Sequence, residues 1–158
     1  MVSSIDEVVD YPDSFYRGIS TKDNITSEGY ILSGAFQFGD YNGKEREDDY
    51  CELSINWNDD EEALSLLLSQ KKPNTDDFQF KAGYCILSLN DMKKMFRPYI
   101  INKDFSYERR PIEEDTENNV RANPYHGNLL LNKNVKKSVR RMIQDSLATL
   151  ATSGLNQL

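Results

Sequence analysis

YCELSINW, residues 50–57, is the stretch that decides the fold of this chain, because apolar and polar side chains alternate along its whole length. One face carries four side chains that suit a core: Cys51, Leu53, Ile55 and Trp57. The opposite face is polar. A period of two with one polar face is typical of a half-buried antiparallel strand. Residues 50–57 therefore predict an antiparallel sheet that packs a core on one side.

Further strands are expected on both sides of this one. Apolar or alternating runs predict them at residues 15–20, 30–38, 78–89, 98–105 and 125–131. Helices are expected at 58–70, with Asn58 as N-cap, at 90–96 after Asn90, and at 132–151. The last of these has apolar residues at the helical period: Val135, Val139, Met142, Ile143, Leu147 and Leu150.

Strands and helices mix here without the regular alternation of a parallel α/β fold. The expected fold class is therefore α+β, a mainly antiparallel sheet of about five or six strands with a long C-terminal amphipathic helix packed on one face. We expect a mobile acidic arm over residues 1–14, a single α+β domain over 15–152 and a frayed tail over 153–158. Residues 107–124 are charged and poor in apolar side chains, which predicts a long exposed loop.

The charge balance limits the partners. The chain of 158 residues has 19 basic and 26 acidic side chains, a net charge of −7. Such an acidic total argues against wrapping nucleic acid or lying on an anionic membrane. The chain has no run of about 18 apolar residues, and its N-terminus lacks the pattern of a secretory signal. We therefore expect a cytoplasmic protein with no membrane partner.

The two cysteines give no sign of a metal site. Cys51 and Cys85 each lie in a strand-like apolar run and match no metal-ligand spacing. Two buried free thiols are the preferred interpretation, and a disulfide across neighbouring strands is the alternative. The sequence also lacks a Rossmann glycine fingerprint and a P-loop. Neither a metal nor a cofactor is expected.

His126 and Arg17 are the candidate catalytic residues. His126, the only histidine, can serve as a general acid or base because its ordinary pKa is near neutrality. The alternative is a structural histidine whose ring nitrogens bind backbone groups. Arg17 lies in the middle of an expected strand, where its guanidinium would bind a phosphate or carboxylate. The alternative for Arg17 is an ion pair with an acid at the edge of the sheet.

A basic cluster opens the expected C-terminal helix. Cations in the first turns of a helix oppose its dipole, so folding does not explain them and an anionic partner is a candidate. The alternative is a solvated face answered by acids elsewhere in the fold. The cluster consists of Lys133, Lys136, Lys137, Arg140 and Arg141.

An acidic segment lies between residues 40 and 62. It has ten acidic residues against Lys44 and Arg46, a net charge of −8. The spacing of these acids does not match a calcium-binding loop. Solvated acids are the preferred interpretation, and an acidic face for a basic partner is the alternative.

Short motifs are spread along the chain: Tyr16-Arg17-Gly18-Ile19, Ser33-Gly34-Ala35-Phe36, Leu53-Ser54-Ile55, Pro124-Tyr125-His126 and Lys136-Lys137-Ser138-Val139. Together they resemble a group of small uncharacterised bacterial proteins, over most of the chain. The chain departs from that pattern at Gly127-Asn128, where alanine and a hydrophobic residue would be expected. The resemblance implies a bacterial source but no activity, and it nominates Arg17 and His126 as positions to compare in space.

Three functions follow from these observations. The preferred one is a small cytosolic bacterial accessory or adaptor protein that binds another protein, such as an immunity, antitoxin or phage-defence component. The second is an enzyme or toxin-like domain that acts on a nucleotide or RNA phosphate, with His126 as acid/base and Arg17 as phosphate ligand. The third is a weak nucleic-acid binder that uses the basic cluster. Complete catalytic motifs are missing, which favours the first.

Overall fold

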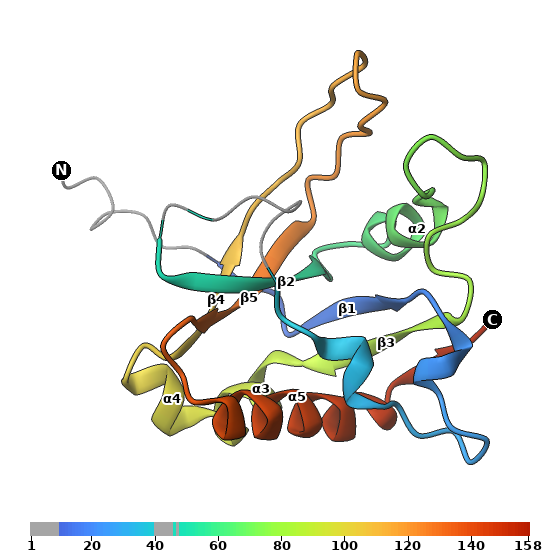
Figure 1. Cartoon of the computed structure of the whole chain (residues 1–158). Helices are drawn as coiled ribbons and strands as arrows, with labels where there is room; N and C mark the ends of the chain where they lie inside the picture. The colour runs from blue at the N-terminus through green and yellow to red at the C-terminus, as the bar shows by residue number, and fades with distance from the viewer. Residues whose placement is uncertain (1–9, 40–45, 47) are drawn as a thin grey trace, which may run out of the picture.

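The computed structural model describes residues 10–39, 46 and 48–158. In this part of the chain, six strands form one antiparallel sheet in the order β4-β5-β2-β1-β3-β6. The strands are β1 (Ser14–Ile19), β2 (Tyr50–Trp57), β3 (Gly83–Ser88), β4 (Phe105–Arg109), β5 (His126–Asn132) and β6 (Leu155–Gln157). Helix α5 (Lys137–Thr152) runs under one face of this sheet (Figure 1). The α+β prediction is confirmed.

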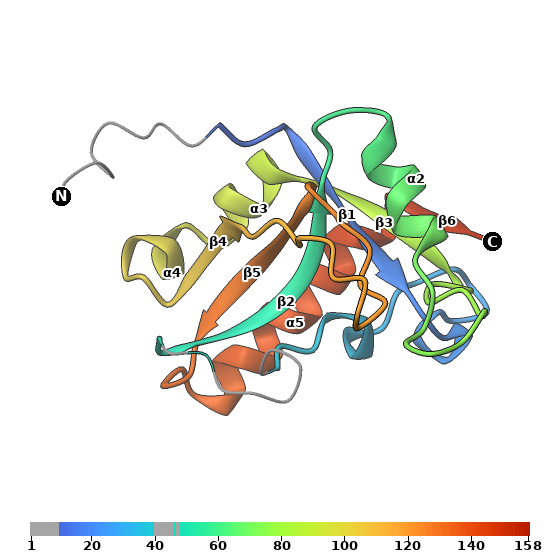
Figure 2. The ribbon, with the colours of Figure 1, turned by 90° about the horizontal axis from the view of Figure 1, so that it is seen from above.

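Smaller helical elements occupy both sides of the sheet. They are η1 (Lys22–Asn24), η2 (Ser33–Phe36), α2 (Glu62–Ser69), α3 (Leu89–Met95) and α4 (Arg97–Ile101). Elements α3, α4 and η2 lie on the side of α5, whereas α2 lies on the opposite side, beside the segment that joins β4 to β5 (Figures 1 and 2). We call the two sides the α5 face and the polar face.

The α5 face holds the core. The apolar core face predicted for residues 50–57 is confirmed, because Leu53, Ile55 and Trp57 are at most 2% exposed. Helix α5 adds Ile143 and Leu147, which are fully buried against the sheet. Full burial of one such side chain stabilises the fold by about 1.5–3 kcal/mol. Met142, expected in the same apolar stripe, is instead 37% exposed on the outer side of the helix.

The polar face is more enclosed than the sequence indicates. Glu52 and Asn56 lie on the predicted solvent side of β2, yet they are only 6% and 2% exposed. The half-buried strand predicted for residues 50–57 is therefore buried on both faces at these positions. What covers them is described below, since it forms the candidate site.

Two strand predictions were wrong. Residues 30–38 contain the short 3₁₀ helix η2 (Ser33–Phe36) and no strand of the sheet. Residues expected as a strand at 98–105 begin with helix α4, in which Pro98 stands in the first turn, a position that suits proline because no intrahelical N–H is needed there. The pairing strand is β4, so Tyr107 to Arg109 belong to the sheet and not to the loop predicted over 107–124.

Several expected boundaries also moved. Helix α2 begins at Glu62, because the side chain of Asn58 donates to Ser14 Oγ (2.9 Å) and does not cap the helix. Ser88, rather than Asn90, caps α3. The C-terminal helix begins five residues later than expected, at Lys137, because β5 continues to Asn132.

The chain ends are held more firmly than predicted. Residues 155–157, placed in an expected frayed tail, form β6 and pair with β3. Of the expected acidic arm, residues 1–9 lie outside the described residues. Tyr11 packs against Trp57 with ring centroids 4.8 Å apart, and the carbonyl oxygen of Asp10 accepts two hydrogen bonds from Arg109. The described end of the arm is thus docked on β4 and β2.

Cys51 and Cys85 are buried free thiols, as the preferred interpretation stated. Cys51 pairs with Leu131 of β5, whereas Cys85 pairs with Arg17 of β1. Because β1 separates β2 from β3 in the sheet, the two cysteines are not on neighbouring strands. The disulfide alternative is therefore wrong.

Candidate functional site

Arg17 lies on the α5 face and cross-links neighbouring segments through hydrogen bonds. It shares that face with Phe15 and Ile19, because alternate residues of a strand point the same way. Its Nε donates to the carbonyl oxygen of Ala35 (3.1 Å) and a terminal nitrogen donates to that of Ser54 (2.8 Å). Burial lowers the pKa of the guanidinium to about 10, so the group stays charged at neutral pH.

The ion pair at the sheet edge that was the alternative for Arg17 does not form among the described residues. Strand β1 lies inside the sheet rather than at its edge, and among the described residues Arg17 has no acidic partner. The charge is answered by backbone carbonyl dipoles alone. Arg17 therefore links β1 to η2 and β2.

His126 lies on the opposite, polar face. It stands across from Asn56 in the β2–β5 register. Its Nδ1–H donates to the carbonyl oxygen of Arg110 (2.7 Å), and the Arg110 N–H donates to the His126 carbonyl oxygen (2.9 Å). Burial lowers the pKa of His126 and outweighs the opposing effect of its bond to Arg110. The imidazole is thus a neutral, anchored group, and it does not meet Arg17.

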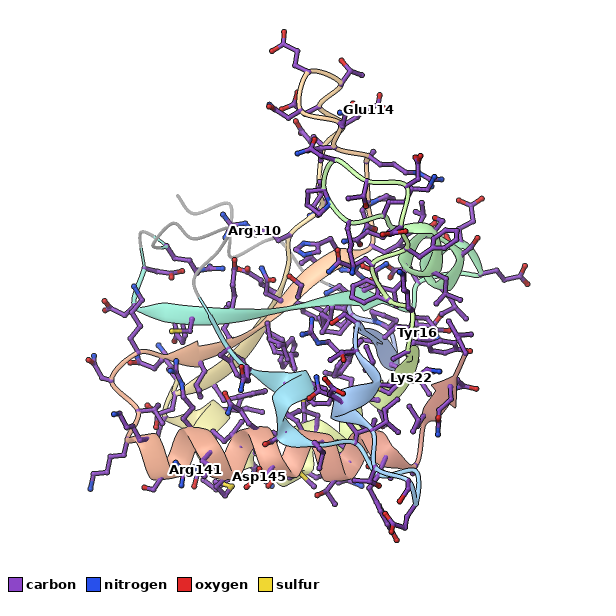
Figure 3. The ribbon with its side chains drawn as sticks, turned by 45° about the vertical axis from the view of Figure 1, so that its right-hand side comes forward. Tyr16, Lys22, Arg110, Glu114, Arg141 and Asp145 are labelled. Atoms are coloured by element: carbon purple, nitrogen blue, oxygen red, sulfur yellow. The ribbon has the colours of Figure 1, made fainter. Side chains whose placement is uncertain are left out.

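The segment that His126 anchors is a projecting arm, residues 110–125. Its two sides are joined by paired backbone hydrogen bonds between Ile112 and Asn123 and between Asp115 and Val120. Figure 3 shows Arg110 where the arm leaves the sheet and Glu114 near its outer end. The part of the predicted loop that follows β4 is therefore an arm held by backbone hydrogen bonds.

The base of the arm is bound to the sheet by amide side chains. The buried Asn123 donates from Nδ2 to Asn56 Oδ1 (2.9 Å) and accepts from the Tyr125 N–H (3.1 Å). Asn56 in turn donates to the carbonyl oxygen of Ala63 in α2 (3.1 Å). One chain of hydrogen bonds thus connects the arm, β2 and α2.

A charged network covers the neighbouring part of the polar face. Arg46, whose side chain is 6% exposed, binds the carboxylates of Asp48, Glu52 and Glu108. Asn128 donates to Glu108 Oε2 (2.8 Å). We call these five residues the Arg46 network. Among the described residues, Glu52 Oε1 and Asn128 Oδ1 have no hydrogen-bond partner, so two buried acceptors of the network are unsatisfied.

The pKa shifts in this network follow from its hydrogen bonds. Burial by itself would raise the pKa of Glu108, but the bonds from Arg46 and Asn128 bring it below the ordinary value. The bond from Arg46 likewise lowers the pKa of Asp48, and the bonds to Asp48 and Glu108 raise that of Arg46. All three groups are therefore charged at neutral pH.

Part of the described acidic segment is bound within the fold, three acids by arginines and one by a tyrosine hydroxyl. Asp48 and Glu52 bind Arg46, Asp59 binds Arg109 (2.7 Å), and Asp60 accepts from the Tyr125 hydroxyl (3.0 Å). The part of the segment at 40–45 and 47 lies outside the described residues. Sequence reasoning missed this use of the acids, and the available signal was one arginine, Arg46, inside a long acidic run.

Gly127 lies at a point where the fold leaves no room for a side chain. The indole N–H of Trp57 reaches past Gly127 to the carbonyl oxygen of Glu108 (3.1 Å). A Cβ at position 127 would collide with that indole nitrogen and that carbonyl oxygen. Alanine, the residue that the resemblance would lead one to expect, does not fit beside Trp57.

Only four of the five residues of the basic cluster are exposed. Arg140 is half-buried and donates to Cys51 Sγ (3.0 Å). The other four are exposed, and no described residue forms an ion pair with any of them. Figure 3 shows Arg141 on the side of α5 that faces away from the sheet. We call the four exposed residues the basic face: Lys133, Lys136, Lys137 and Arg141.

Two hollows flank the arm. The larger, with a volume of about 860 Å³, lies between the arm and the segment from Leu66 to Asp76. The smaller, about 270 Å³, lies at the base of the arm and includes His126 in its lining. Within the described residues, no group of three His, Cys, Asp or Glu side chains is arranged to hold a metal ion.

Comparison with known proteins adds no assignment. The chain matches no family model, no curated protein and no solved structure. In the part of the chain that the structure describes, no helix is long and apolar enough to cross a membrane.

Proposed function

We propose that this protein is a non-enzymatic binding module that docks on an acidic surface of another protein through the basic face. The observation that carries the proposal is that Lys133, Lys136, Lys137 and Arg141 are exposed together and form no ion pair with a described residue. A cytoplasmic bacterial adaptor, of the immunity, antitoxin or phage-defence type, is the setting that we propose for it on chain length and acidity.

Helix electrostatics support a partner for these charges. Helix α5 begins at Lys137, and the side chain of its N-cap residue, Lys136, makes no capping hydrogen bond. Cations near a helix N-terminus face the positive end of the dipole, which costs about 0.3–1 kcal/mol for each well-placed charge. An acidic partner would turn this repulsion into attraction. The arrangement therefore fits binding better than it fits folding.

The overall charge favours a protein over nucleic acid as this partner. The net charge is −7, and the arm presents four exposed acids, namely Glu113, Glu114, Asp115 and Glu117. A long polyanion such as a nucleic acid would extend beyond the basic face and be repelled by these acidic side chains. A protein with a local acidic patch would contact the basic face alone. For the enzyme alternative, Arg17 and His126 face opposite sides of the sheet and are bound to backbone carbonyls.

Charge reversal on α5 tests the proposal. We expect a tagged protein to capture a stoichiometric acidic protein from nuclease-treated lysate of the source cells, and Lys137→Glu/Arg141→Glu to lose it. The matched control is Lys93→Glu/Lys94→Glu at the exposed end of α3, which changes the net charge equally. Capture that survives reversal on α5 would refute the assigned face. Capture of nucleic acid alone, removed by nuclease, would replace the protein partner with the third function.

A further inference from the structure

The larger hollow is a cleft of ligand size. Its volume of about 860 Å³ falls in the range of small-molecule sites, about 300–1,000 Å³. One wall comes from the end of α2 and the following residues 70–76, and the other from residues 118–123 of the arm. Figure 1 places α2 and the arm across the sheet from α5. The cleft is therefore separate from the basic face.

The charge of the cleft is opposite to that of the whole chain. Its lining has three cations, Lys71, Lys72 and Arg121, and one acid, Asp76. Lys71 Nζ lies 3.9 Å from Asp76 Oδ1, with the two side chains 50% and 106% exposed, and so exposed a pair is weak. A lining with a charge of about +2 in a protein of charge −7 attracts an anion at short range.

Arg121 is held in position across the cleft. A terminal nitrogen donates to Ser69 Oγ (3.0 Å), and this hydroxyl itself donates to the carbonyl oxygen of Leu66. A guanidinium has five N–H groups in a planar fork that suits phosphate oxygens. One bond to Ser69 therefore orients the fork and leaves other N–H groups for a ligand.

The rest of the lining suits an organic ring. Apolar contact comes from Leu66, Pro73, Ile112 and Val120, and amide groups come from Gln70, Asn74 and Asn119. Amides offer both donors and acceptors to the edge of a heterocycle. We infer that this cleft binds a small phosphate-bearing organic anion of nucleotide size, with the phosphate at Arg121 and the two lysines and the ring on the apolar residues.

A compact ligand fits better than an acidic peptide. The exposed acids Glu113, Glu114 and Glu117 lie on the same arm and would repel an extended acidic chain that followed it. A nucleotide stays between the two walls, where the cations are. The inference is independent of the proposed docking face, since the cleft lining and the basic face have no residue in common.

Calorimetric titration at low ionic strength tests it, with ADP, adenosine and inorganic phosphate as probes. We expect ADP to bind, and more tightly than either fragment. Arg121→Ala should weaken ADP at least about tenfold, the usual loss for a charge-assisted hydrogen bond. The matched control Lys81→Ala removes one charge from an exposed lysine outside the lining and should bind as the parent does.

Three results would overturn the inference. The first is no measurable binding of ADP at millimolar concentration to the folded protein. The second is equal affinity for ADP and inorganic phosphate, which would leave the ring without a role. The third is parent-like affinity in Arg121→Ala. Because Arg121 is exposed, thermal unfolding of the variant should match the parent, and this measurement separates loss of binding from loss of fold.

Discussion

The packing on the two faces of the sheet is stabilised by different interactions. On the α5 face, Phe15, Trp57 and Leu147 are fully buried in a continuous apolar core. On the polar face, Arg46, His126 and their partners fill the space with charges and amides. In an apolar core, the loss of stability grows with the volume of the side-chain atoms that are removed. A buried polar network is costly as soon as one partner is lost, because the group left behind is desolvated and unpaired.

The largest effect is expected on the α5 face. Leu147→Ala should destabilise the protein by about 2–5 kcal/mol, the usual cost of a cavity at a fully buried leucine. Met142→Ala, on the exposed side of the same helix, should change stability by less than about 0.5 kcal/mol. Urea unfolding measures both. Similar losses in the two variants would contradict the assigned orientation of α5.

On the polar face, Arg46→Met should cost about 3 kcal/mol, because the buried carboxylate of Glu52 and the half-buried carboxylate of Glu108 lose their counter-charge. Adding Glu52→Gln and Glu108→Gln should restore part of the loss, since neutral amides need no cation. Arg121→Met is the exposed control and should be almost neutral. A cost below about 1 kcal/mol for Arg46→Met would show that the network contributes little.

Gly127 lies against the Trp57 indole and the Glu108 carbonyl oxygen, and its substitution should have an intermediate effect. Gly127→Ala is expected to cost about 1–3 kcal/mol, the range for overpacking a filled site. The cost should shrink in a Trp57→Phe background, which removes the indole nitrogen from the space of the new methyl group. A double-mutant cycle measures this coupling. Strictly additive effects would contradict the contact between positions 57 and 127.

A smaller effect concerns pH. Burial lowers the pKa of His126 from 6.5, so below that pH the unfolded chain takes up a proton that the folded chain does not, and stability falls as pH falls. The pKa of Glu108, normally 4.5, is also lowered, against the effect of burial, by its bonds to Arg46 and Asn128. A second decline is therefore expected below 4.5.

The two declines can be separated by one substitution. His126→Gln should lose the upper decline and keep the lower one when unfolding free energy is measured between about pH 8 and about pH 3. An unchanged upper decline in this variant would assign it to another group.

The smallest effect on stability is expected for the basic face. Lys137→Glu/Arg141→Glu should leave the unfolding free energy within about 0.5 kcal/mol or raise it slightly, because acids suit the first turn of a helix. The same variant is the one expected to lose its protein partner. A clear loss of stability would mean that these lysine and arginine side chains serve the fold.

Local patterns were sufficient for two elements of the α5 face, the strand at residues 50–57 and the helix after Lys137. Both elements are confirmed, because strand and helix periodicity are properties of neighbouring residues. The same reasoning failed at residues 98–101, where an apolar run looked like a strand. These residues form helix α4, with Pro98 in its first turn, and periodicity does not separate short apolar helices from strands.

The candidate site was less accessible to sequence reasoning. His126 and the basic cluster were named from residue type, but the role of His126 depends on Arg110, and Arg140 turned out to bind Cys51. Arg46 was counted only as a charge in an acidic run. Its bond to Glu108 joins residues 62 positions apart, and no local signal indicates a pair at that separation.

The sequence by itself thus determined the α+β class, the strand at residues 50–57 and the amphipathic helix α5, because side-chain period follows directly from backbone geometry. Tertiary structure alone decided that Tyr107 to Arg109 and residues 155–157 become sheet strands. It also decided that Glu52 and Asn56 are buried and that the arm and α2 enclose a cleft. These outcomes depend on contacts between distant segments, whose free energy exists only once the chain has brought them together.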